Sequence, residues 1–94
     1  MKVVAFDIDG TIIDYKGQTR NNVVDLIKFF NDIGCKVYVW TGGGMDRAVQ
    51  IVENLGLKGI ATPAVKNTIG KVDVAFDDMD VSLADINIKI WNGF

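Results

Sequence analysis

Short apolar runs alternate along this chain with longer stretches of helical periodicity, and this alternation constrains the fold more than any other feature. Strands separated by helices form right-handed crossovers and a parallel sheet with helices on both faces. We expect strands at 3–6, 35–40, 59–62 (broken by Pro63) and 72–76, helices at about 20–33 and 46–55, a turn or short helix near 82–85, and a half-exposed strand through Ile86, Ile88 and Ile90. The predicted fold class is therefore α/β: a single three-layer Rossmann-like domain over residues 1–94, with a mostly parallel sheet of about five strands.

The composition excludes several kinds of chemistry. The 94 residues carry a net charge of −2, no histidine and one cysteine, so an internal disulfide, a histidine metal ligand and a histidine-based triad are excluded within this chain. The basic residues are scattered and do not form the stripe that a nucleic-acid-binding surface usually shows. The first residues reach a charge too soon for a signal peptide, and no apolar stretch approaches membrane-spanning length. We expect a cytoplasmic protein with no membrane partner.

Polar groups of compatible chemistry follow four of the expected strands. Ligands of open parallel sheets bind beyond the carboxyl ends of the strands, so these groups should converge on one edge. In chain order they are Asp7-Ile8-Asp9-Gly10-Thr11, Thr41-Gly42-Gly43-Gly44, Lys66 and Asp77-Asp78. Four strands that each deliver a suitable group to one edge indicate a functional site.

These residue types indicate a metal and a phosphate. Carboxylates only a few ångströms apart need a cation or a shared proton, and oxygen ligands without His or Cys favour Mg²⁺. A lysine and a threonine opposite the metal would hold phosphate oxygens. The backbone amides of residues 42–44, just before a helix, would add an anion site.

The same residues, in this order, resemble the haloacid dehalogenase-like hydrolase superfamily. The first motif of that superfamily is matched by Asp7-Ile8-Asp9-Gly10-Thr11, the second by the strand that ends in Thr41, the third by a lysine and the fourth by the strand that ends in Asp77-Asp78. The resemblance covers residues 2 to about 80. Because the dehalogenases lack the second acid of the first motif and the cation-pumping ATPases carry lysine there, Asp9 favours hydrolysis of phosphate esters.

The resemblance implies a role for each group. Asp7 would attack phosphorus and form an aspartyl-phosphate, and Asp9 would protonate the leaving oxygen and then take a proton from water. Mg²⁺ would bind the Asp7 carboxylate, the Asp9 backbone carbonyl and Asp77, whereas Asp78 would bind the metal directly or hold a water ligand. Contacts to the substrate phosphate are expected from Asp9, Gly10, Thr41, Gly42 and Lys66.

Two lysines compete for the third motif. Lys71 precedes the fourth strand, so at ~3.3 Å per residue it would lie about 20 Å from Asp77, at the wrong end of the sheet. Lys66 follows the third strand and should lie at the correct edge. We therefore choose Lys66.

The intervals between the motifs are too short for either of the cap domains that usually shield this kind of site, so we expect a capless enzyme. An uncapped site cannot enclose a small metabolite unless a neighbouring subunit does so, which leaves a homo-oligomer open. Capless relatives tend to act on macromolecules, and part of the pattern resembles small phosphatases related to polynucleotide 3′-phosphatases. We expect a phosphorylated substrate, with nucleic acid considered only as a substrate.

Two other functions fit part of the pattern. A receiver-type signalling domain also combines acids, Mg²⁺, threonine and lysine on a parallel sheet, but it places paired acids after the first strand and the acceptor in mid-chain. A binding module with a decayed site is the other alternative, although all four motifs are occupied here.

Overall fold

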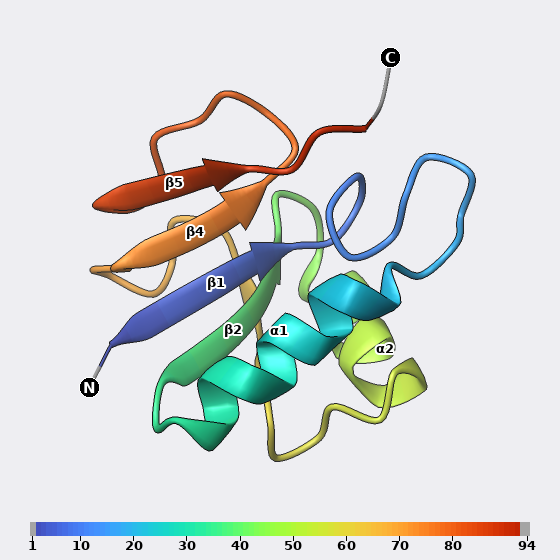
Figure 1. Cartoon of the computed structure of the whole chain (residues 1–94), viewed down its shortest axis with the longest axis horizontal. Coiled ribbons are helices and arrows are strands. Elements are labelled where there is room, and N and C mark those ends of the chain that lie inside the picture. Colours follow the sequence, from blue (N-terminus) through green and yellow to red (C-terminus); the bar gives the residue numbers. More distant parts are fainter. Residues whose placement is uncertain (1, 93–94) are drawn as a thin grey trace.

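Five parallel strands lie side by side in the order β3-β2-β1-β4-β5, with β1 at the centre (Figure 1). The computed structural model describes residues 2–92. Their elements are β1 (Val3–Asp7), α1 (Asn21–Asp32), β2 (Lys36–Thr41), α2 (Met45–Asn54), β3 (Thr62–Val65), β4 (Val74–Asp77) and β5 (Ile86–Lys89). This confirms the predicted α/β domain with five strands, and no cap is present among the described residues.

The two helices pack against the same face of the sheet. Val4 and Phe6 of β1 share this face with the β2 residues beside them, and α1 and α2 bury their apolar stripes against it. The stripes consist of Val23, Val24 and Ile27 in α1 and of Ala48, Ile51 and Val52 in α2. Because the chain moves in one direction from β1 to β2 to β3, right-handed crossovers place both helices on one side.

The expectation of helices on both faces of the sheet is wrong. The other face of the sheet carries Ala5, Trp40, Ala64 and Ala75, and it is covered by Val72, Ile69, Leu83 and Ala84 from the connections between strands. The connection that returns across this face from β3 to β4 comprises only residues 66–73, which is too short to span the sheet and also form a helix.

The third strand is shifted from its predicted position. Residues 59–61 form a turn and bend, and the strand is Thr62–Val65, which pairs with Tyr38 to Thr41 and includes Pro63. Proline, which has no N–H to donate, is tolerated because β3 is an edge strand. The stretch 82–85 contains a bend and no helix. The last strand is present as β5, but it ends at Lys89, before Ile90, and all four of its residues are exposed, where a half-exposed strand was expected.

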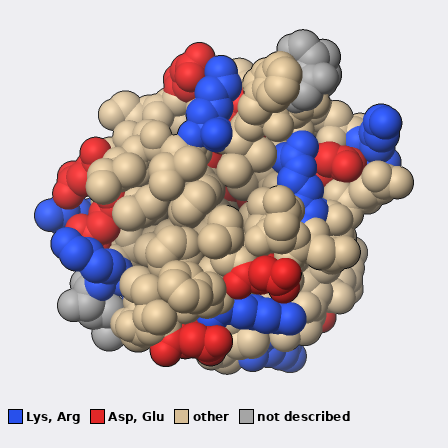
Figure 2. All heavy atoms as spheres, viewed as in Figure 1, with Lys and Arg blue, Asp and Glu red and all other residues tan. Residues whose placement is uncertain are grey.

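The parallel arrangement brings the carboxyl ends of β1, β2, β3 and β4 to one edge of the sheet (Figure 1). On the face seen in Figure 2, basic and acidic side chains are interspersed among uncharged ones. None of the described helices is both long and apolar enough to cross a membrane.

Candidate active site

Asp7 is the last residue of the central strand and lies in the middle of the site. Its carboxylate is buried, with 7 % of the residue exposed. Thr11, from the turn after β1, donates a hydrogen bond from Oγ1 to Asp7 Oδ2 at 3.3 Å. On the other side, Lys66 Nζ lies 2.9 Å from Asp7 Oδ1. The structure therefore places an ammonium directly against this acid.

Lys66 also connects Asp7 to the acids that follow β4. Its Nζ lies 2.8 Å from Asp77 Oδ2, and its backbone N–H donates to the Thr41 carbonyl at 2.9 Å. The ammonium therefore reaches from the edge strand β3 across the end of β2 to β1 and β4. Lys71 lies elsewhere: its Nζ is 3.3 Å from Asp85, next to the start of β5.

Three carboxylates meet at this edge. Asp7, Asp77 and Asp78 each offer one oxygen, and these oxygens all lie within 4.8 Å of one another. Two ligands of one Mg²⁺ ion are at most about 4.2 Å apart, so small side-chain rotations would bring the three oxygens to ligand distance. An all-oxygen set of this kind suits a hard divalent cation, and the residues present therefore fit Mg²⁺.

Burial and charge shift the proton affinities of the central pair. Burial raises the pKa of Asp7 from its ordinary value of 3.8 to about 6; Lys66 opposes this rise, whereas Asp77 and Asp78 add to it. Burial alone would lower the pKa of Lys66, but hydrogen bonds and charge from Asp77 and Asp7 outweigh it, so this pKa is raised. Lys66 is therefore a fixed positive charge at neutral pH.

The turn after β1 is held close to the acids. Gly10 has φ +87°, and a Cβ there would lie 2.2 Å from Asp78 Oδ2, so a larger residue would strain the backbone and displace the Asp78 side chain. Arg20 donates hydrogen bonds to the carbonyls of Gly10 and Thr11, at 2.6 and 3.3 Å, and to the Asn92 side chain. The hydroxyl of Tyr15, from the same loop, donates to Asp78 Oδ2.

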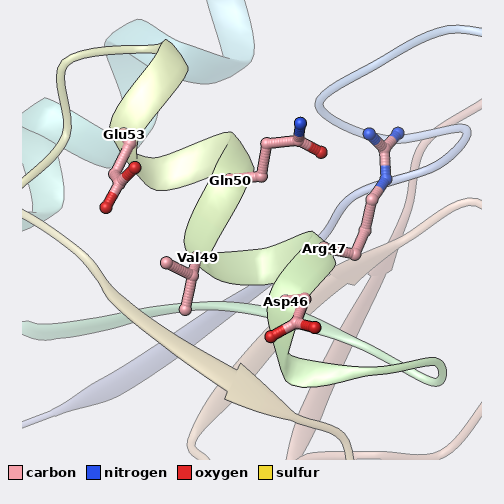
Figure 3. Close-up of a pocket in the computed structure, with 5 residues that line it drawn as sticks. All are labelled: Asp46, Arg47, Val49, Gln50 and Glu53. Carbon is pink, nitrogen blue, oxygen red and sulfur yellow. The ribbon is translucent and has the colours of Figure 1, made fainter.

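Asp9 points away from the group of three acids. Its side chain is 65 % exposed, and its Oδ1 lies 2.7 Å from Nη2 of Arg47 in the first turn of α2. Figure 3 shows Arg47 extending from α2 toward the loop after β1. The same residue borders a hollow of about 450 Å³ on the exposed side of α2, where Asp46, Val49, Gln50 and Glu53 also lie.

The second predicted motif, which begins at Thr41, lies at the same edge, but Thr41 contacts a residue of its own turn. Thr41 ends β2 and is buried, and its Oγ1 accepts a hydrogen bond from the Gly43 N–H at 3.1 Å. Gly42 is exposed in the bend that leads into α2. Residues 42–44 connect Thr41 at this edge to the start of α2, and their role as an anion site stays a prediction.

Sequence reasoning missed three residues of this region, namely Arg47, Tyr15 and Arg20. Arg47 could have been found, because the first turn of a helix that begins at the site edge places its side chains there. The contacts of Tyr15 and Arg20 depend on the course of the loop between β1 and α1, for which no sequence pattern gave a signal.

Together, the fold and this edge define a parallel α/β protein with an acidic site, able to hold a divalent cation, at the carboxyl ends of its strands. The family profile described as haloacid dehalogenase-like hydrolase matches residues 4–68, which is more than half of the chain. The chain therefore belongs to the haloacid dehalogenase-like hydrolases. Asp7, Asp9, Thr41 and Lys66 fall within the matched range, and Asp77 and Asp78 follow it. No match was found among curated proteins or among solved structures.

Proposed function

We propose that this hydrolase is a Mg²⁺-dependent phosphatase that cleaves phosphate monoesters through an aspartyl-phosphate on Asp7. One observation carries the proposal: the buried Asp7 carboxylate lies 2.9 Å from Lys66, and oxygens of Asp77 and Asp78 lie within 4.8 Å of an oxygen of Asp7. This set combines a nucleophile, a charge for phosphate oxygens and ligands for a metal.

In the first step the Asp7 carboxylate attacks phosphorus, and the bond between phosphorus and the leaving oxygen breaks. Asp9 gives that oxygen a proton, and the product alcohol departs. In the second step water attacks the aspartyl-phosphate, Asp9 takes the proton of the water, and inorganic phosphate and free Asp7 are formed. Asp9 must turn from Arg47 toward the substrate to play this part.

The remaining groups hold the phosphate. Lys66 and the Thr41 hydroxyl would contact its oxygens, and the Gly42 amide would add a donor. The Gly10 N–H already donates to the Ile13 carbonyl at 2.6 Å. Bound Mg²⁺, held by Asp7, Asp77 and Asp78, would supply charge neutralisation for the approach of an anionic phosphate to three carboxylates.

The substrate we propose is a phosphorylated molecule that extends out of the site, such as a macromolecule, because no cap covers this edge among residues 2–92. A hollow of about 310 Å³ adjoins the acids and provides room for such a substrate. It is lined by Tyr15, Asp78, Met79, Lys89, Ile90, Trp91 and Asn92. A nucleic acid would enter as substrate only, and the cytoplasm is the proposed location.

Release of phosphate from 4-nitrophenyl phosphate tests the proposal. We expect turnover that requires Mg²⁺ and falls by about 10³-fold or more in Asp7→Asn. Asp25→Asn, at an exposed position of α1 away from the site, serves as the matched control and should keep full activity. Circular dichroism would establish that each variant is folded.

Two results would contradict the proposal. Stable phosphorylation by acetyl phosphate without turnover would indicate a receiver-type domain. Absence of both turnover and Mg²⁺ binding would indicate a binding module.

A further inference from the structure

Arg47 is the cation whose position the proposed reaction leaves unexplained. Its Nη2 lies 2.7 Å from Asp9 Oδ1, and this is the one hydrogen bond its guanidinium makes within residues 2–92. Both partners are open to solvent, since the side chains of Arg47 and Asp9 are 40 % and 65 % exposed. Most of the five N–H donors of this guanidinium are therefore available to an incoming group.

The other cations that reach the site are already committed. Lys66 is only 20 % exposed and contacts two acids. Arg20 is occupied by the carbonyls of Gly10 and Thr11 and by Asn92. Arg47 differs from both because it stands at the rim of the site, on the first turn of α2, and extends toward the loop that carries Asp9 (Figure 3).

The proposed reaction places the leaving group next to Arg47. A general acid must lie about 2.6–3.2 Å from the oxygen that it protonates, so the leaving oxygen comes within that distance of Asp9. Arg47 contacts this carboxylate before it turns, and the short Asp9 side chain can carry its carboxylate only a few ångströms from Arg47. Atoms a few bonds beyond the leaving oxygen therefore come within reach of the guanidinium.

The charge distribution of the site favours a negatively charged leaving group beside Arg47. Asp7, Asp77 and Asp78 would repel any negative group that a leaving group carries, unless a cation faces it. A guanidinium binds carboxylate and phosphate groups through paired, charge-assisted hydrogen bonds. The side of the site toward α2 therefore suits a leaving group with its own negative charge.

We propose that Arg47 is a specificity-determining residue that binds a second anionic group, a phosphate or a carboxylate, on the leaving group of the substrate. This inference rests on the proposed phosphatase function. When the anion binds, Arg47 exchanges Asp9 for the substrate, and Asp9 is freed to turn toward the leaving oxygen. The substrate class is a phosphate monoester whose leaving group bears a negative charge a few bonds from the ester oxygen.

Two matched substrates test the inference: 4-carboxyphenyl phosphate and 4-carbamoylphenyl phosphate, which have nearly the same size and differ in charge. For the wild type we expect kcat/KM to be about 10-fold higher for the carboxylate, through a lower KM, because charge-assisted hydrogen bonds have about this effect. In Arg47→Gln the ratio should fall to near one, and Arg47→Lys should retain part of it. Lys58→Gln, an exposed cation just beyond α2, should keep the wild-type ratio.

An unchanged ratio in Arg47→Gln, or a loss of kcat that is equal for both substrates, would overturn the inference. Calorimetric binding of 4-carboxybenzylphosphonate and 4-carbamoylbenzylphosphonate provides a readout that needs no turnover. Tighter binding of the carboxylate that is lost in Arg47→Gln would support the role of Arg47 even if neither ester were hydrolysed, in which case the phosphatase proposal alone would fail. Equal binding of the two phosphonates by the wild type would overturn the inference.

Discussion

Gly10 shows how tightly single residues determine this site. The residue sits in the turn after β1 with a positive φ, and the Asp78 carboxylate occupies the space where a side chain would begin. Pairing of β1 with β4 brings the two acidic segments together, and the absence of a Cβ at Gly10 leaves the space that the Asp78 carboxylate occupies. A larger residue would force the Asp78 side chain to move.

Substitution of Gly10 by alanine should therefore destabilise the protein and weaken Mg²⁺ binding. The matched control is Gly17→Ala, since Gly17 has a similar φ of +82° and open space around it. We expect Gly17→Ala to lose about 1 kcal/mol of unfolding free energy from backbone strain alone, and Gly10→Ala to lose more. Urea unfolding and Mg²⁺ titration would measure both effects, and equal losses in the two variants would show that the contact with Asp78 has no effect.

The raised pKa of Asp7 predicts a pH-dependent stability in the absence of metal. Because its pKa rises from 3.8 to about 6 on folding, the folded state holds this proton more tightly than the unfolded chain does. The stabilising contribution is full below 3.8 and is lost as the pH rises through about 6.

The side chain in Asp7→Asn cannot ionise. The stability of this variant relative to the wild type should therefore increase as the pH is raised from 3.8 to about 6. The change in this stability difference is at most roughly 3 kcal/mol. It should be smaller than this bound, because Asp7→Asn also removes the carboxylate that contacts Lys66. Urea unfolding in EDTA at several pH values would test this, and a constant difference between the two proteins would contradict it.

At the scale of elements, a cluster of aromatic rings joins α1 to the strands that carry the acids. The rings of Phe6 in β1 and Phe76 in β4 stack with centroids 4.5 Å apart, and Phe30 of α1 lies 6.0 Å from Phe76. Phe6 and Phe76 each immediately precede an acid of the site. Packing of α1 on these rings therefore supports the positions of Asp7 and Asp77.

Loss of the Phe30 ring should be clearly destabilising. We expect Phe30→Ala to lower the free energy of unfolding by about 2–3 kcal/mol, since the ring packs against the core. Phe29→Ala, the neighbouring residue with 52 % exposure, should lower it by less than about 1 kcal/mol. Thermal and urea unfolding would compare them, and similar losses would mean that the aromatic cluster does not stabilise the fold.

The elements also show which parts of the structure could be predicted. Apolar periodicity is local, so the strands before Asp7 and Asp77 and both helices were predicted, and with them the edge where Lys66 and Asp77 meet. The position of β3 was predicted wrongly, because a strand can include Pro63 only if it lies at the edge of the sheet, and the strand order is not visible in the sequence. The contact between Asp9 and Arg47 was missed because it depends on how far a side chain reaches across a loop. The placement of both helices on one face was missed because it depends on the short connection between β3 and β4.

At the scale of the whole molecule, the site gathers negative charge in a small domain. Asp7, Asp77 and Asp78 come from the two ends of the chain, and Lys66 is the ammonium that holds two of them. A divalent cation that binds these acids would join β1 and β4 more firmly and shift the folding equilibrium toward the native state.

Mg²⁺ should therefore raise the Tm of the protein. At a concentration 100-fold above its Kd the added stability is about 2.7 kcal/mol, which corresponds to a rise on the order of 10 °C for a domain of this size. Asp78→Asn should reduce the rise, whereas Asp85→Asn, at the opposite edge, should not. Scanning calorimetry with Mg²⁺ and with EDTA would measure the rise in Tm. An equal rise in both variants would mean that the ion does not bind at Asp78.

In the proposed reaction, Asp7 becomes covalently phosphorylated during turnover. The most direct test of this step is to mix the protein with Mg²⁺ and 4-nitrophenyl phosphate, quench with acid within the first turnovers and locate the phosphate by peptide mass spectrometry. We expect one phosphate on the peptide that contains Asp7, present while substrate remains and gone when it is exhausted. Phosphate on another residue, or turnover without any phosphorylated protein, would contradict the proposed reaction.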